Sequence, residues 1–592
     1  MDQNVDVVDV IISLLESEKY QEAVAVPNDE KYAESFKNSC WDVMTMVLNM
    51  IKDDTVVIKP SLFRACEALL LHTIQKSIPE EALLELIEKV EEAKNEAQLS
   101  LLLPPLQQLL KQLSIKRGRS LEWSLDSIFH YIESIPTTNL GLEGRERILM
   151  DSDKNVRRIT RVYSLLPSFY GAFIEELNEP NSSAKTKQII STFLISLLGK
   201  PLIYIDLDPQ NNDASEIRQV CGILINDICK LEKNVFKFFP YVELSYRENL
   251  KTRPKKVSDF GVEKLPYENE EKINITTLSG FYYFIMSGHF ELPDFSIPQV
   301  YLPDYVIHTV MLCVIHLLSF TEYGPLDKAS HLGKALLKHI PENQSHEMLS
   351  SQVHFDLCKS LMNVAVYCDY EPIRRETINM IGAHIRKFDF KGRSILIKYI
   401  LETSNHSGMI GYAIILFKNA INEAFLNPEL PDCFTGLRFF NMVKKICYLP
   451  HGAESDLVEL ADQIITSLNF LRYLALKDSD NRTGIKDFFT LIESDYLDTL
   501  RVALNMSKAH YEAKLRDLEQ NVNQPEQNLD LSVTVGGHLL DGVPLENQKE
   551  IIASCTYHTE PQTVHQVTSC FSRRGSATPH CNVVVRNPKS KR

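Results

Sequence analysis

The chain has 592 residues, a formal net charge of -15, and 44% hydrophobic and 24% charged residues. Its length is several times that of one ordinary core, which predicts either several domains or one long repeat array. Only 22 glycines are present, too few for the turns of a large β-sandwich or propeller, and this favours helices. The acidic balance disfavours sequence-independent binding of nucleic acid, because neutralising phosphates requires a surplus of lysine and arginine.

The first residues and the cysteines bear on cellular location. Asp2, Asp6 and Asp9 lie where a secretory signal needs positive charge, so we expect no export. No uninterrupted apolar run approaches the ~20 residues of a membrane span, so we expect no membrane association. The 12 cysteines lack the spacing of a zinc or redox motif, and we interpret them as buried free thiols. The expected location is the cytoplasm, with the nucleus as a second site.

Stripes of apolar residues at helical spacing recur along the chain and predict amphipathic helices. In chain order, the clearest stripes lie at 83–90, 220–231, 410–425 and 457–471. Alternating patterns typical of strands are rare. The two candidates, 202–207 and 533–535, are each short enough to be an extended loop.

Helices follow one another with a regular spacing between residues 355 and 425. We expect one helix to about Cys368, a second after an elbow at 369–372, a third ending near Thr403 after a turn at 388–393, and a fourth opened by 404–408. Two helix pairs at this spacing match the ~40-residue period of HEAT and armadillo repeats, whose pairs stack to bury their apolar faces. The sequence therefore predicts an all-α protein, a HEAT- or armadillo-like α-solenoid of stacked helix pairs, helical up to about Gln520.

A polar, proline-containing stretch near residue 260 interrupts the helical pattern and predicts a linker. The predicted organisation is an N-terminal helical repeat region at 1–250, a charged linker or loop at 251–275, a C-terminal HEAT-like region at 276–520 that binds the partner, and a tail at 521–592. A basic cluster in the linker, from Lys251 to Lys256, would suit a nuclear signal or an RNA patch. Acidic residues follow it directly and no aromatic platform accompanies it, so we interpret it as a solvated loop.

Motifs that carry catalysis are missing from the sequence, which has no GxxxxGK[ST], GxGxxG, GxSxG or HExxH pattern. The residues from Asp478 to Asp480 begin like a calcium loop. Thr483 stands in place of the required glycine and Phe489 in place of the bidentate glutamate, which indicates a surface turn. We therefore expect a binding protein with no catalytic residues, cofactor or metal. An enzyme whose residues meet only in three dimensions is the alternative.

Four blocks in the C-terminal part have distinctive sequences. They are TSNHSG at 403–408, LPHGAESDL at 449–457, SLNFLRYL at 467–474 and LNMSKAHYE at 504–512. Together they resemble the glomulin family. The resemblance is detailed over 355–512, and elsewhere it rests on similar helix patterns.

The resemblance implies a function without chemistry. Members of the glomulin family are HEAT-like proteins whose C-terminal half binds the RING domain of the RING-box subunit of cullin-RING ubiquitin ligases, together with its cullin. They cover the surface where the ubiquitin-conjugating enzyme docks and so inhibit ubiquitin transfer. The family has also been linked to immunophilin and receptor-kinase binding and to vascular development. The alternative function is a general α-solenoid scaffold for a receptor or an immunophilin partner.

We expect the partner to contact polar and aromatic residues in or beside these blocks. The candidates are Asn405, His406, Asn469, Arg472, Lys477, Asn505, Lys508, His510 and Tyr511. Arginine and tyrosine rank first, because they dominate interface hot spots. Each candidate also has a structural alternative: the turn at 403–408 would cap a helix, Asn469 and Asn505 would bridge helices, and Arg472 would pair with a carboxylate.

The tail departs from the family pattern after Ile552. Between Thr556 and Arg592 there is no leucine or isoleucine, and Glu560 is the only carboxylate side chain. Such a segment cannot bury enough apolar surface to offset the ~1–2 kcal/mol per residue of backbone ordering. We predict that 556–592 is disordered and that the helical stack lacks its usual C-terminal cap.

Overall fold

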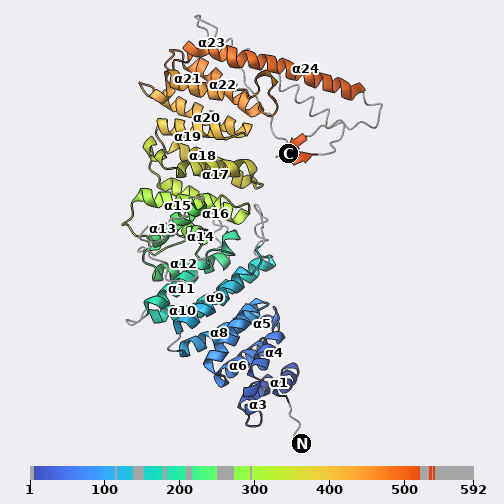
Figure 1. Ribbon diagram of the computed structural model, residues 1–592. Coiled ribbons are helices and arrows are strands. Elements are labelled where there is room, and N and C mark those ends of the chain that lie inside the picture. Colours follow the sequence, from blue (N-terminus) through green and yellow to red (C-terminus); the bar gives the residue numbers. More distant parts are fainter. Residues whose placement is uncertain are drawn as a thin grey trace. The chain divides into compact units, whose positions relative to one another are not determined.

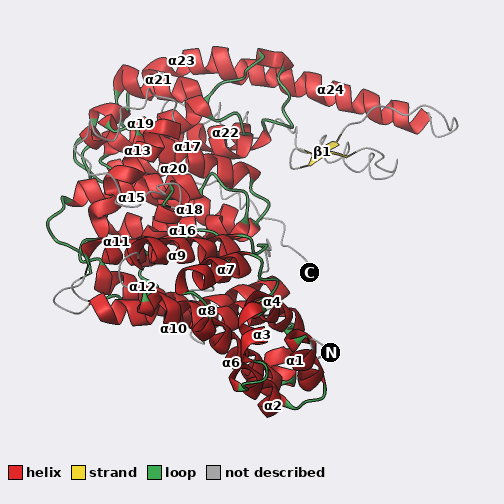
Figure 2. Cartoon of the chain, turned by 60° about the horizontal axis from the view of Figure 1, so that its bottom comes forward, coloured by secondary structure: helices red, strands yellow, loops and turns green. Residues whose placement is uncertain are grey.

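The computed structural model describes residues 6–113, 117–137, 152–177, 183–207, 216–249, 273–293, 296–520, 533–535 and 538–540. The chain forms two compact units. The first comprises Met1–Ile340 with Tyr370–Glu376, and the second Pro341–Asp369 with Thr377–Arg592. Helices dominate both units (Figure 1, Figure 2).

Within its described ranges, the first unit consists mainly of α-helices, with a few short 3-10 helices. Its elements are α1 (Val7–Glu16), α2 (Tyr20–Ala25), η1 (Val26–Asn28), α3 (Ala33–Asn38), α4 (Cys40–Met50), α5 (Thr55–Ile58), α6 (Pro60–Lys76), α7 (Pro79–Glu91), α8 (Glu96–Gln112), α9 (Arg117–Glu133), α10 (Lys154–Leu177), α11 (Ala184–Ser196), η3 (Leu202–Tyr204), α12 (Glu216–Leu231), η4 (Val235–Phe238), α13 (Phe239–Asn249), α14 (Ile275–Met286), α15 (Pro303–Leu317) and α16 (Tyr323–His339).

Local sequence explains where many of these helices begin. The side chain of Asn95 caps α8 by accepting a hydrogen bond from the backbone N–H of Gln98, and Asn274 caps α14 in the same way. Proline occupies the first position of α6, α7 and α15, where its missing N–H costs nothing. The helices then pack in two interleaved series, with α4, α6, α8, α10 and α12 each touching the next, and α7, α9 and α11 doing likewise.

The second unit continues the same architecture. Its elements are η7 (His346–Ser350), α17 (Val353–Tyr367), the part of α18 (Glu371–Arg386) from Thr377 onward, α19 (Phe390–Thr403), α20 (Ser407–Ala424), η8 (Asp432–Phe434), α21 (Gly436–Ile446), η9 (Gly452–Glu454), α22 (Ala461–Lys477), η10 (Ile485–Phe488), α23 (Phe489–Ile492), the π-helical turn η11 (Glu493–Asp498), α24 (Thr499–Gln520), β1 (Val533–Val535) and β2 (His538–Leu540).

Helices of the second unit also form two interleaved series. In one, α17 packs on α19 and α19 on α21; in the other, α20 packs on α22. Tyr412 of α20 donates a hydrogen bond to the backbone O of Ile378 in α18 at 3.0 Å, which joins α18 to the second series. Within each unit the chain is therefore an α-solenoid of stacked helix pairs, and the predicted fold class is confirmed.

The predicted helices between 355 and 425 correspond to α17, α18, α19 and α20, and the last long helix ends at Gln520 as expected. Two starting points differ. The third helix begins at Phe390 because Asp389 caps it, and α22 begins only at Ala461, although Leu457 is already buried. Leu457 is buried because the turn before α22 packs inward. In the sequence, Leu457 therefore looks like the first apolar residue of the helix, although the helix begins four residues later.

Three short segments also refine the sequence interpretation. Residues 202–204 form the 3-10 helix η3, so the first strand candidate is wrong. Val533–Val535 is a strand that pairs antiparallel with His538–Leu540. The turn after α22 is closed by Asp478, which accepts hydrogen bonds from the backbone N–H groups of Arg482 and Thr483. Asp478 is 1% exposed, so the first residue of this turn is buried instead of lying at the surface.

The cysteines within the described ranges are free thiols, most of them buried, with Cys368 and Cys433 partly exposed. Burial raises the pKa of Cys66, Cys313 and Cys358 to about 12, so these thiols stay protonated near neutral pH. The structural role expected for these cysteines is confirmed for the part of the chain that the structure describes.

Some expectations fall on residues outside the described ranges. These are most of the predicted linker, at 250–272, and the tail segment 556–592. Among the helices that are described, none combines the length and the apolar character that a membrane crossing requires.

Candidate partner-binding surface

The turn at 403–408 caps a helix. His406 is the N-cap of α20, where its Nδ1 accepts a hydrogen bond from the backbone N–H of Met409 at 3.4 Å. Its own N–H donates to the Ser404 hydroxyl at 3.3 Å. The capping alternative therefore holds for this turn, although a histidine makes the cap in place of the serine or asparagine usual there. Asn405 and His406 are both exposed, so capping leaves their outer surfaces open to a partner.

One face of α22 carries two of the predicted contact residues. Asn469 and Arg472 are three positions apart on this face, roughly opposite the buried residues Ser467, Phe470 and Leu474. Asn469 is exposed and Arg472 is half-buried. Neither side chain has an ion pair or side-chain hydrogen bond with a residue that the structure describes, so the bridging and charge-pairing alternatives find no support there.

Two exposed apolar residues extend this face in both directions. Ile465 precedes Asn469 by four positions and is 51% exposed, and Leu476 follows Arg472 by four positions and is 66% exposed. Residues spaced i, i+4, i+7 and i+11 lie in one line along a helix. We call the line formed by Ile465, Asn469, Arg472 and Leu476 the α22 face. It is about 16 Å long at 1.5 Å per residue.

Helix α20 runs parallel to α22 and lies beside it. The Ser407 hydroxyl accepts a hydrogen bond from the backbone N–H of Gln463 at 3.1 Å, which places the starts of the two helices together. Near their ends, Tyr473 donates to Asn422 Oδ1 at 2.9 Å. Ile415 of α20 is 40% exposed, and Leu426, two residues beyond the end of α20, is 84% exposed.

Helix α24 contributes a second group of candidates. Its first turns are buried at Leu500 and Ala503, whereas Asn505, Lys508 and His510 are all exposed. The C-terminal part of α24 extends beyond the stacked helices of its unit (Figure 1, Figure 2). Asn505 makes no hydrogen bond to another described side chain, and Lys508 is 4.0 Å from Glu512 in an exposed pair that contributes little.

Two of the predicted contact residues, Tyr511 and Lys477, are not placed on the surfaces described so far. Tyr511 belongs to α24, but its side chain lies outside what the structure describes. Lys477 is exposed at the last position of α22. Because it follows Arg472 by five positions, it is turned by roughly 140° from that residue and does not share the α22 face.

Packing brings the four distinctive blocks together. The turn at 403–408 meets the start of α22 through Ser407, and Ser467 of α22 shares a buried hydrogen bond of 2.5 Å with Tyr496 of η11. The short helix η9, inside the block at 449–457, packs against α24. Blocks separated by about 100 residues in sequence thus surround α22 in space, and they support both the α22 face and the start of α24.

Sequence reasoning missed Ile465 and Leu476. Apolar residues are normally assigned to a core, and both fall within a segment rich in buried leucines. Their spacing could have identified them. Positions 465 and 476 fall on the same side of a helix as Asn469 and Arg472, and they do not continue the series of buried residues that includes Leu468 and Leu471.

Among the residues that the structure describes, no three His, Cys, Asp or Glu side chains are grouped so that they could hold a metal ion. The α22 face combines apolar side chains with an arginine and an asparagine, a composition that is common in protein interfaces.

The stacked helix pairs of both units define a protein of the α-helical repeat class. Residues 33–535 match the family described as "Uncharacterised protein family, YAP/Alf4/glomulin". The chain belongs to this family.

Two curated relatives are similar over most of their length. Glomulin from Homo sapiens is 27% identical over 492 residues, which cover 81% of this chain and 78% of the relative. Glomulin from Mus musculus is 26% identical over 583 residues, covering 94% of this chain and 92% of the relative. The resemblance seen in the four sequence blocks is thereby confirmed.

Proposed function

We propose that the chain binds the RING domain of the RING-box subunit of a cullin-RING ubiquitin ligase and blocks docking of the ubiquitin-conjugating enzyme. In this proposal it inhibits ubiquitin transfer by steric occlusion, without catalysis, in the cytoplasm or the nucleus. The function is the one that membership of the glomulin family implies, and the exposed α22 face is the observation in this chain that supports it.

The α22 face has the features that such a contact needs. Ile465 and Leu476 are large apolar side chains that remain half or more exposed, although burying each in an interface would gain about 1 kcal/mol or more. Arg472 lies between them without an ion pair among the described residues, so its guanidinium is available to a partner carbonyl or carboxylate. The buried line on the opposite side of α22 fixes the helix, so little ordering entropy is lost on binding.

Binding of a purified RING-box–cullin complex to the full chain tests the surface directly. We expect the double variant Arg472→Ala, Leu476→Asp to weaken binding at least tenfold, about 1.4 kcal/mol, because it removes one anchor and places a charge where an apolar group is buried. Surface plasmon resonance measures the affinity, and circular dichroism shows whether the variant stays folded.

Lys444→Ala is the matched control, because Lys444 is exposed on the neighbouring helix α21 and lies outside the α22 face. It should bind as the unaltered chain does. Binding of the folded double variant within a factor of about three of the unaltered chain would place the contact elsewhere.

A further inference from the structure

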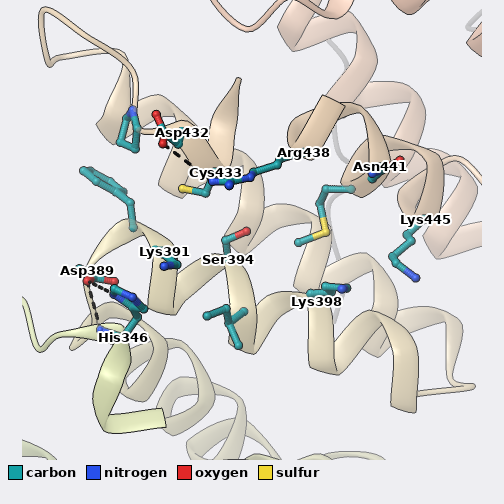
Figure 3. A pocket seen from close by; sticks show the side chains of 14 residues that line it. His346, Asp389, Lys391, Ser394, Lys398, Asp432, Cys433, Arg438, Asn441 and Lys445 are labelled. Atoms are coloured by element: carbon teal, nitrogen blue, oxygen red, sulfur yellow. Dashed lines mark hydrogen bonds and ion pairs between the residues drawn. The ribbon is translucent and has the colours of Figure 1, made fainter. Parts of the chain in front are cut away.

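A groove with a volume of about 720 Å³ lies between α19 and α21. Figure 3 shows its two walls, with Lys391, Ser394 and Lys398 on one side and Arg438, Asn441 and Lys445 on the other. Neither α19 nor α21 contributes to the α22 face, so the groove is a separate feature of the second unit.

The two walls carry matching sequences. Along α19, Lys391, Ser394 and Lys398 are spaced i, i+3 and i+7. Along α21, Arg438, Asn441 and Lys445 have the same spacing. Each helix therefore offers a cation, a small polar group and a second cation in line, with the two cations about 10 Å apart.

Apolar side chains lie between the two pairs of cations. Ile395 of α19 and Met442 of α21 both line the groove, and Phe390 and Pro431 line its end. A ligand that fits this arrangement has two negative charges with an apolar group between them.

Acidic residues neutralise the positive charges at one end of the groove more fully than those at the other end. At one end, Glu402 lies 2.7 Å from Lys445 and 3.9 Å from Lys398, so both cations already have a partner. At the other end, Asp432 is 3.8 Å from Arg438 in a highly exposed pair, which is worth little. Asp389 is occupied by the Gly392 N–H and by His346. Lys391 is exposed and has no ion pair with a described residue.

We propose that this groove binds a short acidic peptide segment of a partner protein, in extended conformation, with one carboxylate between Lys391 and Arg438 and a second near Lys398 and Lys445. A chain in the extended polyproline II conformation rises about 3.1 Å per residue with three residues per turn, so acidic residues three positions apart lie on the same side and span the two cation pairs. An intervening apolar side chain packs between Ile395 and Met442.

A short peptide fits better than a nucleic acid. The chain carries a net charge of -15, which repels a long polyanion, whereas a peptide with two carboxylates needs only the local charge of the groove. The apolar positions between the cations also favour a side chain over a sugar-phosphate backbone.

Fluorescence anisotropy with the full chain tests the proposal. The probe is a fluorescein-labelled eight-residue peptide with two glutamates three positions apart and a leucine between them. We expect saturable binding that the charge reversal Lys391→Glu, Arg438→Glu weakens at least tenfold. Lys444→Glu makes the same kind of change on α21 outside the groove and should alter the affinity less than twofold.

A second variant tests the proposal through a gain in peptide affinity, which misfolding cannot explain. Glu402→Gln releases Lys398 and Lys445 from their internal carboxylate, so we expect it to tighten peptide binding by about threefold or more. A damaged fold would not produce such a gain.

Several results would overturn the proposal. They are an affinity unchanged by the charge reversal, equal binding of the peptide with both glutamates replaced by glutamine, and tighter binding of a twelve-nucleotide single-stranded DNA than of the peptide. Because the α22 face is untouched by these variants, binding of the RING-box–cullin complex should be unchanged in all of them, which separates this proposal from the function proposed above.

Discussion

His384 of α18 has no hydrogen-bond partner for either ring nitrogen among the described residues, although it is fully buried. Its ring stacks on His354, with 5.3 Å between centroids, and meets the edge of Phe388. Burial and, to a smaller extent, the neighbouring His354 lower the pKa of His384 to about 3. The imidazole is thus held neutral inside the second unit.

This histidine predicts a loss of stability in mild acid. The unfolded chain binds a proton at His384 below about pH 6.5, whereas the folded chain does not until about pH 3, so the free energy of unfolding falls as the pH falls through this window. At pH 5 the loss from this residue is about 2 kcal/mol. His384→Leu, close in volume, should reduce the drop in urea midpoint between pH 7.5 and pH 5.0.

Other histidines, which are partly buried, would contribute to the remaining pH dependence, since partial burial also lowers the pKa of His289 and His316 to about 4. Exposed His451 gives the control, and His451→Leu should leave the drop unchanged. An equal drop in the His384 variant and the unaltered chain would contradict the argument.

At single residues the sequence was informative about polar positions and less so about apolar ones. Arg472 and Asn469 could be proposed as contacts because they lie in the block at 467–474 that resembles the glomulin family, and arginine is also frequent in interface hot spots. Ile465 and Leu476 could not, because whether an apolar residue is covered depends on which neighbour packs beside it, and that is a tertiary fact. Asp478 shows the opposite error, because it was expected at the surface and is buried. Three local hydrogen bonds to its carboxylate make this burial possible.

Between elements, the contact of α22 with η11 connects the α22 face to the last long helix. Tyr496 is 2% exposed, and its hydroxyl lies 2.5 Å from the Ser467 hydroxyl. Ser467 itself donates to the backbone O of Ile464 at 2.9 Å, so Tyr496 is the donor in the shared bond. This bond fixes the position from which α24 starts.

Removing the bond should cost a moderate amount of stability. Tyr496→Phe keeps the ring and deletes the donor, so we expect the free energy of unfolding to fall by about 1 kcal/mol, the usual contribution of a buried hydrogen bond whose other partner stays satisfied. Urea denaturation followed by circular dichroism measures the change. Tyr448→Phe alters an exposed tyrosine and should have no effect; a loss as large as that of Tyr496→Phe would mean that the buried bond is not the cause.

Helices α17 to α20 could be predicted from sequence because each has a regular apolar line and a clear break before the next. The start of α22 could not, since the buried Leu457 lies in a turn and continues the apparent line by four positions toward the N-terminus. Residues 202–204 were equally ambiguous, because a short apolar run suits a strand or a buried turn equally well.

Over the whole molecule, stacking explains why binding surfaces can be separate within one unit. Each helix buries one face against the neighbours in its own series and the other series, and its remaining face is open. The α22 face belongs to the series of α20 and α22, and the basic groove to the series of α19 and α21. Fold class followed from composition and helical spacing alone, whereas the division into two units near residue 340 had no marker in the sequence.

The central claim is that the chain inhibits ubiquitin transfer by occupying the docking site of the conjugating enzyme. Its most direct test is the single-turnover discharge of ubiquitin from a charged conjugating enzyme by a RING-box–cullin complex, measured with increasing amounts of the chain. We expect the discharge rate to fall as the chain saturates the complex and to recover when more conjugating enzyme is added, since the two compete. A rate that the chain leaves unchanged, or an inhibition that excess conjugating enzyme does not relieve, would contradict it.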